Sequence, residues 1–262
     1  MASPIILEVR GLSAPPLLRG EFSFILREGD RLGVYGHSGS GKSVLLRALM
    51  RLMPYRGEVV WHVARSSVGY ASQRPRLIPR ASVLQQILWC AQLHGVSLSP
   101  HGSRIHELLE QWGLQPRRQQ AVHRLSVGEQ VRLEMCCAMA TASRLLVVDG
   151  LLEQMDERTR ATFWEEVDAR CARRELAVIF ATHSAREAEM ADRVLILHEG
   201  RPLAIDTPDR LRALAEEQTV QLRSVQARLK RGDKQEEVQV TLHRRPTMED
   251  VLHTLLQREG LP

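Results

Sequence analysis

Residues 36 to 43 have the types and spacing needed to hold a chain of phosphates. They satisfy the pattern GxxxxGK[ST] at every fixed position. Three glycines let consecutive backbone N–H groups curl around phosphate oxygens. The lysine places a positive charge near the β- and γ-phosphates, and the serine hydroxyl after it is a natural Mg²⁺ ligand. The sequence therefore predicts a nucleoside triphosphate site, with Mg²⁺, formed by Gly36, His37, Ser38, Gly39, Ser40, Gly41, Lys42 and Ser43.

This segment needs a strand before it and a helix after it, and the sequence provides both. An apolar run at 31–35 leads into it, and apolar residues at helical spacing follow over 43–53. Further short apolar runs alternate with helical patterns, which favours a mostly parallel sheet covered on both faces. We expect the other strands at 5–9, 21–26, within 57–70, and at 145–149, 177–181 and 194–197, with helices at 157–174 and 186–191.

The remaining segments suggest additions to this α/β core. Residues 82–143 are mostly helical in pattern, with a Gly/Ser/Pro-containing loop at 95–103, and predict a helical subdomain inserted into the core. After residue 200 we expect a helix at 208–217, two strands at 219–228 and 236–242 around the turn Arg231–Gly232–Asp233, and a helix capped by Thr247. The predicted boundaries are a nucleotide-binding domain at 1–206, with the helical subdomain at about 82–144, and a C-terminal extension at 207–262.

Composition narrows the class of protein further. The chain has 262 residues, 44% hydrophobic and 26% charged, which is typical of a soluble globular fold. We see no window long and apolar enough to span a membrane and no secretion signal, and four cysteines without CxxC spacing suit a reducing compartment. The net charge of +5 rests on 33 arginines against 3 lysines, which allows contact with nucleic acid or an anionic membrane. Aromatic residues make up only 4%, so nucleic-acid binding is not the favoured interpretation.

A second segment, Leu125–Ser126–Val127–Gly128–Glu129–Gln130, precedes an amphipathic helix and stands 23 residues before Asp149. A serine side chain and a glycine backbone at a helix N-terminus can face another phosphate, although an ordinary helix cap is an alternative interpretation. Together with the phosphate loop, this segment resembles the LSGGQ signature of the ATP-binding cassette (ABC) ATPases, with departures at Val127 and Glu129. The resemblance covers roughly residues 5 to 205 and implies a P-loop NTPase fold with an antiparallel β subdomain.

The resemblance implies roles for further residues. Gln73 looks like the glutamine that contacts Mg²⁺ or its water and senses the membrane partner. Asp149 ends a buried-type strand, as does the aspartate that binds Mg²⁺ in this family, so Ser43, Gln73 and Asp149 form the expected metal set. His183 looks like the switch histidine at the γ-phosphate, and Asp156 like the aspartate that acts across a dimer interface. Ser126 and Gly128 would face the nucleotide of the partner.

Two departures from the family pattern affect the expected chemistry. Gly150 stands where the family has a glutamate that polarises the attacking water, and glycine cannot act as a base. Glu153 lies three residues further along, and we do not expect it to reach the site. The segment Gly11–Leu17 offers no aromatic residue for the adenine to stack on. These losses predict a degenerate site, with intact ATP and Mg²⁺ binding but slow hydrolysis.

The resemblance therefore implies an ATP-binding subunit, without its own membrane span, that drives a separate transmembrane subunit by ATP-dependent dimerisation. It would lie in the cytoplasm, peripherally on the inner face of the cell membrane. Because of Gly150, a heterodimer with a second, competent cassette is favoured over a homodimer. Residues 246–251, Pro-Thr-Met-Glu-Asp-Val, resemble the ending of exporter-type cassettes, so export is the expected direction. A soluble ABC-type ATPase and an ATP-gated scaffold stay open as alternatives, whereas no NKxD motif supports a GTPase.

Overall fold

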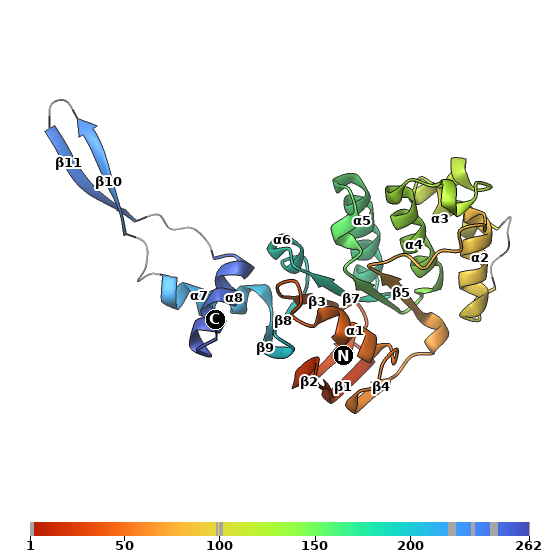
Figure 1. Cartoon of the computed structure of the whole chain (residues 1–262), viewed down its shortest axis with the longest axis horizontal. Coiled ribbons are helices and arrows are strands. Elements are labelled where there is room, and N and C mark those ends of the chain that lie inside the picture. Colours follow the sequence, from red (N-terminus) through yellow and green to blue (C-terminus); the bar gives the residue numbers. More distant parts are fainter. Residues whose placement is uncertain are drawn as a thin grey trace.

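The computed structural model describes the backbone of residues 3–97, 99, 102–219, 224–231, 234–241 and 246–261. The side chains of residues 216–245 are not described. The central element is a six-stranded sheet in the order β5-β6-β7-β3-β8-β9 (Figure 1). Its strands run parallel except β9, which pairs antiparallel with β8. These strands are β3 (Arg31–Tyr35), β5 (Val68–Ser72), β6 (Leu145–Asp149), β7 (Ala177–Thr182), β8 (Arg193–His198) and β9 (Arg201–Asp206).

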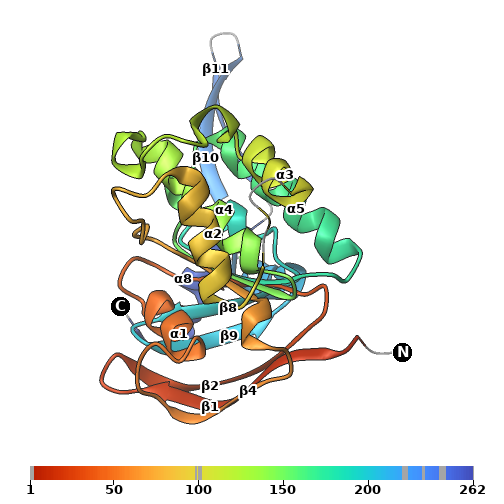
Figure 2. The same cartoon turned by 90° about the vertical axis from the view of Figure 1, so that its right-hand side faces the viewer.

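A second sheet of three antiparallel strands packs below the first, in the order β2-β1-β4 (Figure 2). Its strands are β1 (Ile5–Ala14), β2 (Leu18–Arg27) and β4 (Arg56–Trp61). The expected α/β fold with a mostly parallel sheet and an antiparallel β subdomain is therefore confirmed. The apolar alternation that predicted strands at 5–9 and 21–26 arises because these strands bury only one side.

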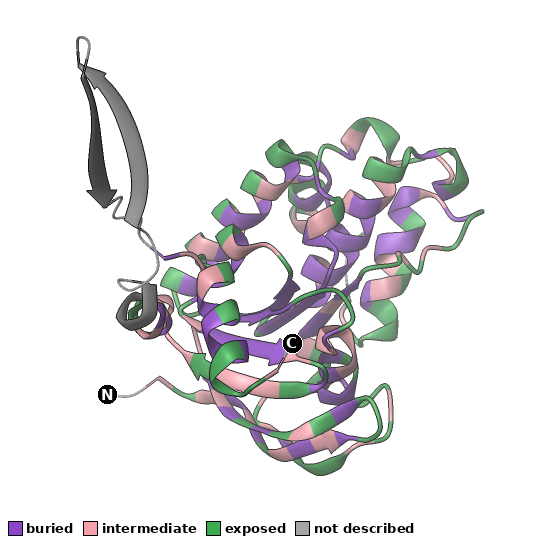
Figure 3. Cartoon of the chain, turned by 60° about the vertical axis from the view of Figure 1, so that its left-hand side comes forward, coloured by how far each residue is buried: buried purple, intermediate pink, exposed green. Residues whose placement is uncertain are grey.

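Helices cover the two faces of the central sheet, and the apolar residues of β6 alternate between two cores. Leu145 and Val147 join the core that contains α1 (Lys42–Leu49) and the antiparallel sheet. Leu146 and Val148 join the core formed with the remaining helices. Figure 3 shows this arrangement as buried strands enclosed by helices whose outer faces are exposed. Those helices are α2 (Val83–Leu93), α3 (Ser103–Gln111), α4 (Val127–Thr141), α5 (Glu157–Ala172), α6 (Ala185–Ala188), α7 (Pro208–Thr219) and α8 (Met248–Arg258).

Two helices end earlier than their apolar spacing predicted. The helix expected over 43–53 ends at Leu49, because Arg51 adopts φ +55° and the N–H groups of Arg51 and Leu52 close back onto Ala48 and Arg47. The helix expected over 186–191 ends at Ala188, since the N–H groups of Met190 and Ala191 bond only three residues back. Apolar periodicity continues through such closing turns and so overestimates helix length.

The C-terminal part contains a strand pair, as expected, and a capped helix. β10 (Ser224–Arg231) pairs antiparallel with β11 (Lys234–Thr241). Parts of the two predicted strands, at 220–223 and at 242, and the predicted turn residues Gly232 and Asp233 lie outside the described residues. Thr247 caps α8 in a reciprocal box with Asp250. Buried apolar residues of α8, including Met248 and Val251, belong to the same core as the central sheet.

Candidate functional site

The phosphate loop joins the end of β3 to the start of α1. Gly36 is required there because a Cβ at that position would lie 2.3 Å from the Leu197 carbonyl oxygen. Gly41 begins the helix at φ +106°, a conformation that other residues rarely adopt. The Lys42 ammonium donates to the carbonyl oxygens of Gly36 at 2.7 Å and His37 at 2.8 Å. The loop is thus closed on itself by the lysine that would otherwise contact phosphate, with the α1 N-terminus behind it.

Asp149 belongs to the metal-binding set expected from the sequence, together with Ser43 and Gln73. It ends β6 with only 1% of its surface exposed. Its Oδ1 accepts a hydrogen bond from the Ser43 hydroxyl at 2.5 Å, and its Oδ2 accepts one from the Tyr70 hydroxyl at 3.1 Å. Burial and the carboxylate raise the pKa of Tyr70, so its hydroxyl remains a donor. A carboxylate and a hydroxyl in contact form a donor set that suits Mg²⁺.

A cavity of about 230 Å³ gathers most of the predicted site residues. Its lining combines residues of the phosphate loop with residues from the carboxyl ends of β5, β6 and β7, where parallel sheets place their ligand sites. Of the predicted residues, those at the cavity are Ser38, Gly39, Gly41, Lys42, Ser43, Gln73, Asp149, Gly150 and His183. Gly36 and His37 contribute the carbonyl groups that hold Lys42, and Ser40 is buried with no hydrogen-bond partner for its hydroxyl among the described residues.

Glu153 also lines this cavity, so our expectation that it would not reach the site was wrong. Gly150 has φ +67°, and the short helical turn Leu152–Gln154 then returns the chain toward His183. The Glu153 carboxylate accepts a hydrogen bond from the His183 backbone N–H at 3.2 Å, and its Oε1 lies 2.5 Å from His183 Nδ1. Gly150 brings no side chain to the cavity, but the carboxylate of Glu153, three residues later, lies in the same cavity.

The segment that carries Gln73 is held by a buried carboxylate of α4. Glu134 accepts hydrogen bonds from the backbone N–H of Ser72 at 3.2 Å, from its hydroxyl at 3.0 Å, and from the backbone N–H of Arg76 at 3.2 Å. Burial raises the pKa of Glu134 even though these three donors favour the charged form. We did not single out Glu134 in the sequence, although an acidic residue between the apolar Leu133 and Met135 was a signal for it.

The signature-like segment lies away from this cavity. The Ser126 hydroxyl caps α4 by accepting from Glu129 N–H, and the Glu129 carboxylate accepts from Ser126 N–H at 2.8 Å. The hydrogen bond from the Ser126 N–H lowers the pKa of Glu129, and so does Arg117, whose Nε lies 2.9 Å from Glu129 Oε1. The helix-cap interpretation is therefore correct within one chain, and Gly128 beside the cap leaves the helix end open. Asp156 likewise caps α5, through Thr159 N–H at 2.7 Å, and does not line the cavity.

The turn between β1 and β2 lies against the phosphate loop. Gly200 connects them, because its N–H donates to the Ser40 carbonyl at 2.8 Å and its carbonyl accepts from Arg19 and Gly20. Leu17, in this turn, is 57% exposed. This turn therefore presents an exposed aliphatic side chain, in the segment that has no aromatic residue for the base to stack on.

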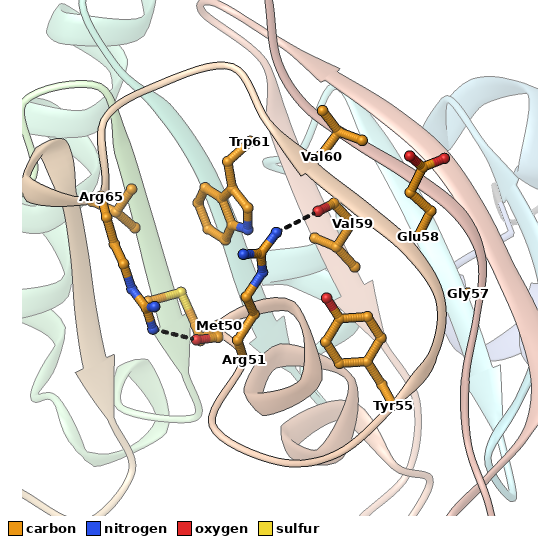
Figure 4. A pocket seen from close by; sticks show the side chains of 10 residues that line it. Met50, Arg51, Tyr55, Gly57, Glu58, Val59, Val60, Trp61 and Arg65 are labelled. Carbon is orange, nitrogen blue, oxygen red and sulfur yellow. Dashed lines mark hydrogen bonds between the residues drawn. The ribbon is translucent and has the colours of Figure 1, made fainter.

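A larger cavity, of about 510 Å³, lies at the other end of α1 (Figure 4). Its two arginines are used by the fold, since Arg51 donates to the Val59 carbonyl at 2.8 Å and Arg65 to the Met50 carbonyl at 3.0 Å. Tyr55 and Trp61 supply aromatic walls. Size alone would favour this cavity, but the phosphate loop, Asp149 and His183 are all at the smaller one.

The residues at the smaller cavity fit ATP with Mg²⁺. Gly39 has open space where a Cβ would stand, Lys42 brings a positive charge to the cavity, and Ser43 with Asp149 forms a hard-oxygen pair. Burial lowers the pKa of Lys42, against the opposing effect of Glu153 and Asp149. Over the described residues, no group of three or more His, Cys, Asp or Glu residues forms an additional metal site. None of the helices in the described part of the chain combines the length and apolar character that crossing a bilayer requires.

Known proteins resemble this chain in sequence and fold. The energy-coupling factor transporter ATP-binding protein EcfA1 of Geobacillus kaustophilus is 29% identical over 80% of this chain and 81% of its own length. The Fe(3+) ions import ATP-binding protein FbpC of Streptomyces avermitilis is 35% identical over 69% of this chain, which spans 55% of that relative. A solved structure described as the ATP binding subunit of an ABC transporter superposes with a TM-score of 0.73 at 23% identity, covering 79% of this chain and 92% of that one.

A family model described as ABC transporter matches residues 20–152, slightly more than half of the chain. This range contains the phosphate loop, the signature-like segment and Asp149. The match agrees with the geometry of the cavity and with the fold. The chain therefore belongs to the ABC transporter family, as one of its ATP-binding domains.

Proposed function

We propose that this chain binds Mg²⁺–ATP and, by ATP-dependent head-to-tail dimerisation, drives a separate membrane-spanning subunit. The observation that carries the proposal is the single cavity shared by Lys42, Ser43, Asp149 and His183. In this assignment Lys42 binds the β- and γ-phosphates, and Ser43, Asp149 and Gln73 hold the Mg²⁺ ion, which neutralises phosphate charge. Ser126 and Gly128, outside the cavity of their own chain, bind the nucleotide of the partner.

Asp156 acts in the same interface rather than in its own cavity. It caps the start of α5 and lines a polar cavity together with Arg132 and Arg158. With its carboxylate occupied by the helix N-terminus, it presents a rigid turn to a partner chain. Residues 1–206 form the ATP-binding unit in this proposal, and residues 207–262 an extension whose last helix packs on the same core.

The membrane subunit would dock beside Gln73. Exposed apolar side chains on α2 and in the loop before it are Ile78, Trp89 and Leu93, of which Leu93 is 86% exposed. The Ile78 backbone N–H donates to Gln86 Oε1 at 2.9 Å, which attaches the loop after β5 to α2. We define these three residues as the docking surface; a short apolar segment of the membrane subunit would cover it. The chain then lies in the cytoplasm, on the inner face of the membrane.

Hydrolysis at this site is slow in our proposal, because Gly150 offers no carboxylate at the position used in the family. A heterodimer solves this problem by combining one slow site with a second site that uses the glutamate of a competent cassette and Ser126 of this chain. Export is the proposed direction, supported by the resemblance of residues 246–251 to exporter-type endings.

The test is a tagged pull-down from gently solubilised native membranes, with identification of every chain that is recovered. We expect a membrane-spanning protein together with a second cassette that carries the missing glutamate. A variant with Leu93→Glu, which places a charge on the docking surface, should lose the membrane protein while retaining ATP binding. Recovery of soluble partners alone would overturn the transporter assignment, and recovery of the membrane protein without a second cassette would overturn the heterodimer.

Turnover tests the slow site separately. The purified full chain should bind Mg²⁺–ATP and hydrolyse it slowly, whereas fast turnover by the unmodified chain alone would overturn the impaired site. The direction of transport is tested by loading reconstituted vesicles with extracts of the source membranes and following which compounds leave or enter on addition of ATP.

A further inference from the structure

The Glu153–His183 pair has a geometry that the loss of a carboxylate at position 150 does not predict. One carboxylate oxygen, Glu153 Oε1, accepts a hydrogen bond from the His183 backbone N–H at 3.2 Å and lies 2.5 Å from the ring Nδ1. A neutral imidazole this close to an ionised carboxylate holds its proton on Nδ1, because an ionised carboxylate has no proton to donate. In that tautomer the other ring nitrogen, Nε2, has a free lone pair.

This pair is located where the transferred phosphate would lie. Both side chains line the cavity that contains Lys42, Ser43 and Asp149. The Glu153 side chain is mostly covered, whereas the His183 side chain is more than half exposed.

The backbone explains why a carboxylate from residue 153 arrives here. Gly150 turns the chain through a left-handed conformation, and the Gln154 side chain then donates to the carbonyl oxygen of Gln73. This contact and the buried Leu152 fix the turn on which Glu153 stands. A residue with a Cβ rarely adopts φ +67°, so a glutamate at position 150 is poorly compatible with this turn. A carboxylate from position 150 and one from position 153 are therefore alternative ways to supply an acidic group to the cavity.

We propose that Glu153 and His183 act as a substitute dyad for ATP hydrolysis at this site, with Glu153 as the positioning residue and His183 as the proton acceptor. This inference rests on the proposed function. A water molecule attacks the γ-phosphorus, the bond from that phosphorus to the β,γ-bridging oxygen breaks, and ADP leaves with the bond electrons. The proton of the water passes to His183 Nε2, and Glu153 stabilises the imidazolium until the proton is released to solvent. The slow ATP hydrolysis proposed for this chain would then be the hydrolysis that the Glu153–His183 pair supports.

The experiment is a double-mutant cycle on the full chain, measuring ATP affinity, thermal unfolding and single-turnover release of phosphate. Glu153→Gln keeps the shape of the side chain but removes its charge. We expect it to lower the hydrolysis rate at saturating ATP by at least about tenfold, with ATP affinity changed less than about twofold. His183→Ala should lower the rate at least as much, and the double variant should be no slower than His183→Ala, because the pair acts as a unit.

The matched control is Glu165→Gln, an exposed residue of α5 outside the cavity, which should leave the rate unchanged. The dyad is overturned if Glu153→Gln hydrolyses ATP like the unmodified chain, if the two losses multiply, or if Glu153→Gln loses affinity but keeps its rate. It is also overturned if the unmodified chain binds ATP and releases no phosphate, a result that leaves the proposed function standing. Failure to bind ATP at all would instead overturn the proposed function.

Discussion

The Ser43 hydroxyl donates a hydrogen bond to Asp149 Oδ1 at 2.5 Å, which joins the phosphate loop to the end of β6 across 106 residues of sequence. In our assignment both residues would hold the Mg²⁺ ion, which would supply positive charge to the phosphates. Asp149 is buried, so its charge has few other partners there: Tyr70 at 3.1 Å and, more distantly, Arg47 at 3.9 Å. This relationship makes the metal dependence of nucleotide binding the most direct test of the site.

Replacing Asp149→Asn should remove most of the gain in ATP affinity that Mg²⁺ provides. The amide keeps a similar size and can still accept from Ser43, but it lacks the charge that a hard cation needs. The measurement is a titration with ATP in the presence of Mg²⁺ and of a chelator. The unmodified chain should differ strongly between the two conditions and the variant little; a variant with the full Mg²⁺ gain would show that Asp149 is not a ligand.

Replacing Gly150→Glu should destabilise the fold by roughly 1–2 kcal/mol, because a residue with a Cβ is strained in the left-handed conformation. The space itself is open, since the nearest Gln73 atoms lie 3.5 Å from an added Cβ. Gly150→Asn is the matched control, because asparagine tolerates this conformation and should lose less. Urea unfolding measures both free energies, and equal losses for the two variants would contradict the assignment of the effect to φ.

Replacing Leu17→Tyr should tighten ATP binding by about tenfold, since stacking of a base on an aromatic ring contributes roughly 1–3 kcal/mol. Leu17 is exposed in the turn that lies against the phosphate loop. Leu93→Tyr, at an exposed position on α2, adds the same ring elsewhere and should leave ATP affinity unchanged. Equal affinities for the unmodified chain and the Leu17 variant would place the base away from this turn.

Replacing Glu134→Gln should change how stability depends on pH. Burial raises the pKa of Glu134 above its ordinary value of 4.5, so the unfolded chain releases this proton at lower pH than the folded chain does. The contribution of Glu134 to the stability of the unmodified chain therefore falls as pH rises from about 4.5 through the folded-state pKa. The variant has no such proton to lose.

The free energy of unfolding of the unmodified chain minus that of the variant should decrease over this range, as measured by urea unfolding at several pH values. The hydrogen bonds lost on substitution shift this difference by a constant, so the slope isolates the titration of Glu134. A difference that stays flat or increases with pH would contradict the raised pKa.

Much of the site could be predicted from the sequence because its residues follow local rules. The phosphate-loop pattern predicts the position of Lys42, and the apolar run before Asp149 predicts a buried strand. The roles of Asp149 and His183 beside that loop were implied by the resemblance to the ABC ATPases. Glu153 was not expected there, because its approach depends on the left-handed φ of Gly150, which no residue pattern displays. Glu134 contacts Ser72, 62 residues earlier, and a pairing at that separation cannot be derived from one helix pattern.

The hydrogen bonds between Glu134 and Ser72 have a consequence for cooperativity between the two nucleotide sites of a pair. Ser126, the residue proposed to contact the nucleotide of a partner chain, caps the start of α4. Glu134 follows about two helical turns later, roughly 12 Å along the helix axis. The Glu134 carboxylate accepts a hydrogen bond from the backbone N–H of Ser72. Ser72 directly precedes Gln73, which we assign to the chain's own nucleotide. In the proposed pair, a shift of α4 caused at one nucleotide would therefore move Ser72 and Gln73 at the other. The two nucleotides of an assembled pair would not be sensed independently, and occupancy of the second should alter the release rate of the first.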